Sequence, residues 1–114
     1  MASILIVDDE IGIRDLLSEI LSDEGYTVEE AENAEVARQK VAQTKFDLIL
    51  LDIWMPDMDG VSLLKEWKAD KDFESQVIMM SGHATIETAV EATKFGSLSF
   101  LEKPISMQKL LQAV

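Results

Sequence analysis

The sequence contains no cysteine, only two prolines and a single histidine. Without cysteine, a disulfide framework and thiolate metal sites are excluded, and the composition fits a reducing compartment, so we expect a cytoplasmic protein. Basic residues are also scarce: 10 lysines and arginines stand against 22 aspartates and glutamates, for a net charge of −12. Such a surface repels phosphate backbones, so we expect no direct nucleic-acid binding by this domain.

Long apolar runs are absent as well. The N-terminal stretch MASILIVDDE has no basic segment and only a short apolar run before its acids. It therefore predicts neither a signal peptide nor a membrane span. Hydrophobic residues still make up 47% of the 114 residues, which excludes a disordered chain and allows one domain with its own core over residues 1–114.

Short apolar runs alternate regularly with amphipathic stretches. We predict strands at residues 3–7, 27–31, 46–52, 76–81 and 98–103. We predict helices at residues 11–24, 33–43, 61–69 and 85–95, and a last one from residue 106 onward. The unbroken apolar run at 48–51 indicates a strand that is covered on both faces. Strict alternation favours parallel pairing through right-handed crossovers, so the predicted fold is α/β with a doubly wound, five-stranded parallel sheet.

The helices carry end signals and apolar faces. Gly25 is placed to end the first helix, and Asn33 and Ser106 are placed to cap the second and the last. Periodicity predicts that the first helix buries a stripe including Leu16. The buried residues predicted for the fourth helix are Ile86, Ala89, Val90 and Thr93. Because the last helix has barely two turns, we expect an excised domain or the front of a longer chain.

Polar residues follow the predicted strands. Asp8 and Asp9 come after the first strand, Asp52 ends the third, Ser81 ends the fourth and Lys103 ends the fifth. In a doubly wound sheet these ends meet at the edge where ligands bind. Clustered carboxylates repel one another unless a cation lies between them. A hard divalent cation such as Mg²⁺ fits this oxygen-rich set, whereas no set of histidine and cysteine ligands supports zinc.

This combination of groups is suited to phosphoryl transfer. A carboxylate can act as the nucleophile and form an aspartyl phosphate. A metal ion and a lysine can neutralise charge on the equatorial oxygens of the transferred group. The pattern therefore predicts a phosphoryl-accepting carboxylate at this edge of the sheet.

Four segments carry a family resemblance: VDDE (7–10), LLDIWMPDMDG (50–60), MMSGHA (79–84) and FLEKP (100–104). With these segments in this order, the chain resembles the receiver domain of two-component response regulators over essentially its whole length. The stretch at 80–104 further resembles receivers of NtrC-type activators, NtrX in particular. The resemblance implies the flavodoxin-like, CheY-like (βα)5 fold with strand order 2-1-3-4-5. It also implies a sigma-54-dependent ATPase module and a DNA-binding output domain, neither of which lies within residues 1–114.

The resemblance implies a role for each acid at the site. Asp52 matches the phosphoacceptor. Asp9 and Asp52 match direct ligands of Mg²⁺ (or Mn²⁺), together with the backbone carbonyl of Trp54. Asp8 matches a residue that assists the metal through water.

The resemblance also implies a set of switch residues. Ser81 matches the hydroxyl that reaches a phosphoryl oxygen, and Lys103 the amine that pairs with the phosphoryl group. Pro104 matches a proline that family members hold in a cis bond. Phe100 matches the aromatic that turns inward when Ser81 moves. For His83, two interpretations stay open: tuning of the phosphoryl lifetime, and the favoured one, a solvated bystander.

The resemblance implies partners as well. A sensor histidine kinase supplies the phosphoryl group, and we predict homodimerisation on phosphorylation through the face built from the fourth helix, fifth strand and fifth helix. A free-standing phosphorelay receiver without DNA-binding output is the alternative function.

Single residues and the whole site also have alternative interpretations. Asp9 has an alternative role as the cap of the first helix. Asp57 and Asp59 are interpreted as turn residues, with Gly60 supplying a permissive backbone. A haloacid dehalogenase would need an acid two residues after its nucleophile, where this sequence has Trp54. A calcium loop lacks its alternate acids and terminal glutamate. A purely structural domain with an inactive site is disfavoured by the complete set of polar residues.

Overall fold

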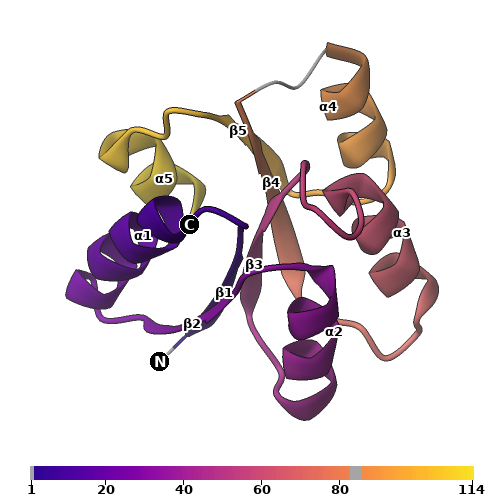
Figure 1. Ribbon diagram of the computed structural model, residues 1–114, viewed down its shortest axis with the longest axis horizontal. Helices are drawn as coiled ribbons and strands as arrows, with labels where there is room; N and C mark the ends of the chain where they lie inside the picture. Colours follow the sequence, from indigo (N-terminus) through magenta and orange to yellow (C-terminus); the bar gives the residue numbers. More distant parts are fainter. Residues whose placement is uncertain (1, 83–85) are drawn as a thin grey trace.

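The computed structural model describes residues 2–82 and 86–114 and shows a parallel sheet between two layers of helices (Figure 1). The strands are β1 (Ser3–Val7), β2 (Thr27–Ala31), β3 (Leu48–Asp52), β4 (Gln76–Ser81) and β5 (Ser99–Glu102). The helices are α1 (Ile11–Asp23), α2 (Ala34–Gln43), α3 (Gly60–Ala69), α4 (Ile86–Lys94) and α5 (Met107–Ala113). The strand order is β2-β1-β3-β4-β5, and every pair is parallel, so the predicted topology is confirmed.

The two helical layers explain the unbroken apolar strands. Helices α1 and α5 cover one face of the sheet, and α2, α3 and α4 cover the other (Figure 1). Alternate residues of one strand therefore enter different clusters: Ile4 and Ile6 pack toward α1 and α5, whereas Leu5 and Val7 pack toward the other layer. All five residues of β3 are buried for the same reason. No helix within the described ranges is long and apolar enough to cross a membrane.

The predicted end signals are confirmed. Asn33 Oδ1 accepts a hydrogen bond from the Val36 N–H at 2.8 Å, and Ser106 Oγ accepts one from the Lys109 N–H at 3.1 Å. Gly25 follows α1 with a φ of +93°, a left-handed conformation that glycine adopts without steric cost. Local side-chain chemistry therefore sets these helix ends.

Two predicted helix faces are wrong in part. Leu16 is 50% exposed, because the sheet side of α1 is filled by Leu17 and Leu21. In α4, Val90 is 61% exposed and Thr93 is exposed, whereas the methyl group of Ala92 is fully buried. A small residue lets the backbone of α4 approach the sheet, and the larger side chains then turn outward. Of the other residues predicted to be buried, Ala89 is half-buried, and the burial of Ile86 and the predicted helix start at 85 lie outside the described part of the chain.

Gly60 is required by close packing. Its N–H donates to the Ile53 carbonyl at 2.6 Å, and a Cβ added at this position would lie 2.2 Å from the backbone oxygen of Asp52. Its φ is not positive, so the prediction of a permissive backbone is wrong. The absence of a side chain lets the first turn of α3 lie directly against the end of β3.

We expect Gly60→Ala to lower the free energy of unfolding by about 2–3 kcal/mol, because the added methyl group would displace either α3 or the end of β3. Urea unfolding followed by circular dichroism measures the change. Gly12→Ala is the matched control, since a Cβ there meets no atom within 4 Å. The control should stabilise α1 by about 0.5 kcal/mol. Equal unfolding free energies for the two variants would contradict the close-packing explanation.

Candidate functional site

The carboxyl ends of the parallel strands bring together the polar residues that follow them. Lys103 Nζ lies 2.7 Å from Asp8 Oδ2 and 3.5 Å from Asp52 Oδ1, so one ammonium group contacts the carboxylate that follows β1 and the one that ends β3. The Lys103 N–H also donates to the carbonyl of Ser81 at 2.9 Å. Four of the five predicted residues, one from each of four strand ends, are therefore neighbours in space.

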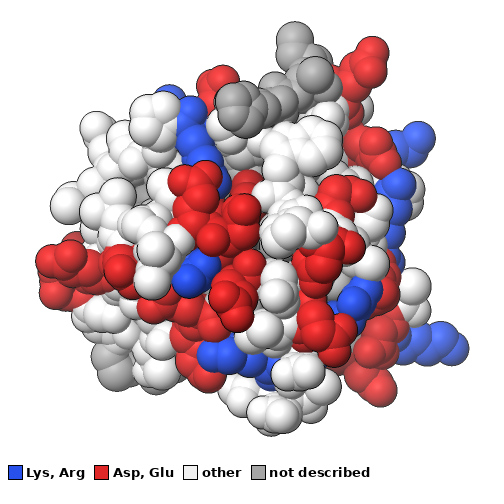
Figure 2. All heavy atoms as spheres, in the orientation of Figure 1, with Lys and Arg blue, Asp and Glu red and all other residues white. Residues whose placement is uncertain are grey.

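A cleft of about 220 Å³ opens at this edge of the sheet. Its lining residues are Asp9, Glu10, Asp52, Trp54, Gly82 and Lys103. Asp52 is 4% exposed and lies at the floor, whereas Trp54 is 52% exposed at the rim. Acidic side chains are abundant on the visible face of the molecule (Figure 2). The cleft therefore gives a small reagent access to a carboxylate that is otherwise buried.

The charges at the site are incompletely balanced. Burial and the neighbouring charge of Asp8 raise the pKa of Asp52 to about 6, against the opposing effect of Lys103. Burial by itself lowers the pKa of Lys103, but its hydrogen bond to Asp8 and the charge of Asp52 raise it overall. Lys103 therefore stays charged at neutral pH. Its single positive charge faces two buried carboxylates, which leaves a negative site suited to a cation.

A set of carboxylates at the site can hold a metal ion. Oxygens of Asp8, Asp9 and Glu10 all lie within 4.8 Å of one another. The donors are oxygens, which hard divalent cations such as Mg²⁺ prefer. Glu10 was not among the predicted site residues, although it directly follows the two predicted acids.

Arg14 is a second residue that the sequence analysis missed. Its Nη1 donates to the backbone carbonyl of Asp8 at 2.6 Å, and its Nε lies 3.4 Å from a carboxylate oxygen of Glu30 in β2. Its place one turn into α1, after two acids, was the available signal. Arg14 therefore fixes the turn in which the acids lie.

The alternative role of Asp9 as a helix cap is wrong. The N-cap residue of α1 is Glu10, and its side chain makes no capping hydrogen bond. Instead, Asp8 Oδ1 accepts from the Glu10 N–H at 2.9 Å. Asp9 is exposed and faces the cleft.

The interpretation of Asp57 and Asp59 as residues that only shape a turn is also incomplete. Asp59 caps α3, since its carboxylate accepts from the Ser62 N–H at 2.9 Å. Asp57 instead reaches back to the preceding helix, α2, where its two oxygens accept from the N–H groups of Ala34 (3.1 Å) and Glu35 (3.0 Å). Asp57 thus joins the segment after β3 to the N-terminus of α2.

Of the three remaining predicted residues, the structure describes Phe100 and Pro104. Phe100 is half-buried in β5, opposite Met79 of β4. The peptide bond between Lys103 and Pro104 is cis. His83 lies outside the described residues.

Sequence comparison decides the family. The profile of the response regulator receiver domain matches residues 4–114. The chain belongs to the response regulator receiver family. Domains of this family are phosphoacceptor regulatory modules rather than classical enzymes, and they interact with histidine kinases.

The relatives place this receiver among the NtrC-type domains. It is 44% identical over 110 residues to the nitrogen assimilation regulatory protein NtrX of Azorhizobium caulinodans. The matched region covers 95% of this chain and 24% of that protein. The chain thus spans about a quarter of the length of the curated relatives it matches.

Solved receiver structures agree in fold. The beryllofluoride-activated NtrC4 receiver domain dimer superposes with a TM-score of 0.91 at 42% identity, covering 98% of this chain and 92% of that one. The chemotaxis protein CheY4 of Vibrio cholerae gives a TM-score of 0.91 at 33% identity, covering 98% and 94%. The receiver fold is therefore shown by topology and by comparison.

We expect Asp52→Asn to stabilise this receiver at neutral pH. A raised pKa means that the folded state binds the Asp52 proton more tightly than the unfolded chain, whose aspartate titrates near 3.8. This contribution to stability is complete below about pH 4 and is lost as the pH rises through about 6. Because asparagine stays neutral, the variant should gain up to about 3 kcal/mol in unfolding free energy at pH 7.5 and almost nothing at pH 4.

Urea unfolding at the two pH values, in buffer without divalent cations, measures this gain. Asp15→Asn removes the same charge from an exposed position of α1 and should show no comparable dependence on pH. A loss of stability in Asp52→Asn at pH 7.5 would contradict the electrostatic account of the site.

Proposed function

We propose that Asp52 of this receiver accepts a phosphoryl group from a sensor histidine kinase and thereby switches the α4–β5–α5 face. The observation that carries this proposal is the pairing of a buried carboxylate, open to a cleft, with the ammonium of Lys103 at 3.5 Å. A phosphorylated histidine is a suitable donor, because its P–N bond is weak. The reaction belongs in the cytoplasm, where such kinases expose their phosphohistidine.

The transfer step follows from the positions of these groups. A carboxylate oxygen of Asp52 attacks phosphorus, the bond from phosphorus to the donor nitrogen breaks, and the electron pair leaves with the imidazole. Since the pKa of Asp52 is about 6, the carboxylate is mostly ionised at neutral pH and can act as the nucleophile. Lys103 stabilises the negative charge on the equatorial oxygens of the phosphoryl group. Its contact with Asp8 keeps its ammonium group close to Asp52 before the reaction.

The carboxylates of Asp9 and Asp52 and the carbonyl of Trp54 would hold Mg²⁺ (or Mn²⁺), with Asp8 assisting through water. The oxygen donors and the excess negative charge around Asp52 fit a divalent cation. When bound, the ion supplies charge neutralisation to the phosphoryl oxygens. The same groups allow the receiver to assist both its own phosphorylation and the later hydrolysis by water.

The response begins with new electrostatic contacts. A phosphoryl group adds nearly two negative charges and strong acceptors. It competes with Asp8 for Lys103 and attracts the hydroxyl of Ser81, which is fully buried at the end of β4. Phe100 packs on the same face of the sheet as α4. We therefore assign to Phe100 the inward turn that follows the movement of Ser81.

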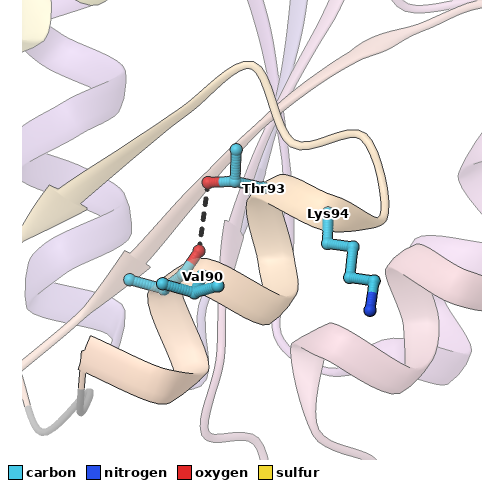
Figure 3. A pocket seen from close by; sticks show the side chains of 4 residues that line it. Val90, Thr93 and Lys94 are labelled. Atoms are coloured by element: carbon cyan, nitrogen blue, oxygen red, sulfur yellow. Dashed lines mark hydrogen bonds between the residues drawn. The ribbon is translucent and has the colours of Figure 1, made fainter.

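The outer face of α4 supplies an apolar contact surface. A depression of about 540 Å³ is lined by Ala89, Val90, Thr93 and Lys94. Figure 3 shows this face, on which Thr93 Oγ1 donates to the Ala89 carbonyl at 3.0 Å and leaves a methyl group and Val90 for contact. The NtrC4 relative was solved as an activated dimer. We assign the phosphorylation-dependent homodimer of this receiver to its own α4–β5–α5 face, which includes this depression.

The output is transcriptional in this proposal. The matched relatives include nitrogen assimilation and transcriptional regulatory proteins, each about four times as long as this chain. A sigma-54-dependent activator is therefore the whole protein that we propose for this receiver.

Incubation with phosphoramidate and Mg²⁺ should add the mass of one phosphoryl group, as measured by intact mass spectrometry. Asp52→Asn should abolish the adduct, whereas Asp59→Asn should leave it intact. Lys103→Ala should slow the reaction by about 100-fold, because it removes a charge that stabilises the transition state. Chelation of Mg²⁺ should also suppress the adduct. The absence of an adduct on the wild type, or its survival in Asp52→Asn, would overturn the proposed function.

We expect Val90→Glu to prevent dimerisation of the beryllofluoride-treated receiver, because it places a charge on the apolar face of α4. Sedimentation equilibrium at several protein concentrations measures the association. Ala42→Glu is the control, since Ala42 is an exposed apolar residue on α2, which packs on β1 and β2, at the opposite edge of the sheet from β5. Dimerisation that is lost in the control and kept in Val90→Glu would move the interface away from α4.

A further inference from the structure

Asp57 makes a contact that its position in a turn did not predict. Its two carboxylate oxygens accept hydrogen bonds from the first two N–H groups of α2, those of Ala34 at 3.1 Å and Glu35 at 3.0 Å. Asn33, the helix's own cap, accepts only from the Val36 N–H. The N-terminus of α2 is therefore capped twice, once from within its own segment and once by a residue from beyond β3.

The chemistry of an ionised aspartate suits this contact. Its two oxygens serve two adjacent donors, and a negative charge is favoured at the N-terminus of a helix. Slight burial opposes ionisation, but the hydrogen bonds from Ala34 and Glu35 lower the pKa of Asp57 overall. Asp57 is therefore charged at neutral pH, and asparagine would reproduce only part of the contact.

The segment at 53–59 is fixed on both sides of Trp54. At its start, the Ile53 N–H donates to the Met80 carbonyl at 3.0 Å, and the Ile53 carbonyl accepts from Gly60. At its far end, Asp57 holds α2, and the sulfur of Met58 lies 3.2 Å from Arg38 Nη2 of the same helix. Trp54 lies between these fixed points, one residue after the first and three before the second.

From this arrangement we propose that Asp57 is a positioning residue of the phosphoacceptor site. By tying residues 53–59 to α2, it sets the path of the backbone at Trp54, whose carbonyl serves as a metal ligand and whose ring forms the rim of the cleft. The inference rests on the proposed function for the role of the Trp54 carbonyl. It adds that the metal site depends on a helix that contributes no ligand.

The test compares Asp57→Ala with Asn33→Ala in the full 114-residue chain. Each variant removes capping from the N-terminus of α2, so each should lower the melting temperature by a few degrees. Only Asp57→Ala also removes the hydrogen bonds that tie the segment at 53–59 to the N-terminus of α2. Asp57→Asn retains an acceptor oxygen and should give an intermediate result.

Two measurements report on the segment itself. Acrylamide quenching in buffer without Mg²⁺ reports mainly on Trp54, because Trp67 is only 6% exposed and stacks on Phe73. A titration of Trp54 fluorescence with Mg²⁺ gives the dissociation constant. For Asp57→Ala we expect stronger quenching and an affinity weaker by about 10-fold, the lower end of the range for groups that orient metal ligands. For Asn33→Ala we expect both to match the wild type.

The outcomes separate the inference from the proposed function. Equal quenching and equal Mg²⁺ affinity in Asp57→Ala and the wild type would overturn the inference, even if phosphorylation of Asp52 proceeds. A parallel change in Asn33→Ala would also overturn it, because general loosening of α2 would then explain the effect. A wild type that takes up no phosphoryl group defeats the proposed function, whereas the quenching comparison still tests whether Asp57 fixes the segment.

Discussion

One ammonium group, that of Lys103, stands between two buried carboxylates, and the arrangement of this receiver depends on it. Asp8 and Lys103 lie 95 residues apart in the chain, yet their charged atoms are 2.7 Å apart. Burial of two carboxylates without a cation would cost several kcal/mol. The ion pair therefore requires that β1, β3 and β5 end at the same level, and the parallel sheet provides this alignment.

Around this ion pair, contacts from several elements hold the acids in place. Arg14 holds the carbonyl of Asp8 from α1, and Gly60 lets α3 lie against the carbonyl of Asp52. Both contacts involve backbone oxygens, so they fix position while the carboxylates remain available for chemistry. The site thus combines a backbone fixed by several contacts with an unbalanced negative charge.

Much of this could be predicted from the sequence, for physical reasons. Alternation of apolar runs and amphipathic stretches dictates a parallel sheet, and a parallel sheet dictates that residues after its strands meet. Contacts between separate elements could not be predicted in this way. The bond from Asp57 to α2 spans more than 20 residues and leaves no periodic signal. Val90 and Leu16 belong to the apolar stripes predicted for α4 and α1, but both side chains are exposed. The surface of each helix that packs on the sheet is narrower than its apolar stripe.

The way α4 packs on the sheet makes its position sensitive to ionic strength. Among its described side chains, only Ala92 is buried, so little apolar area ties this helix to the sheet. Its neighbour α3 holds it through Lys65, whose Nζ lies 2.6 Å from Glu91 and 4.5 Å from the centre of the Phe95 ring. Contacts of this kind between exposed groups weaken as salt screens them. The helix to which we assign the output surface is thus held in part by exposed contacts that salt weakens.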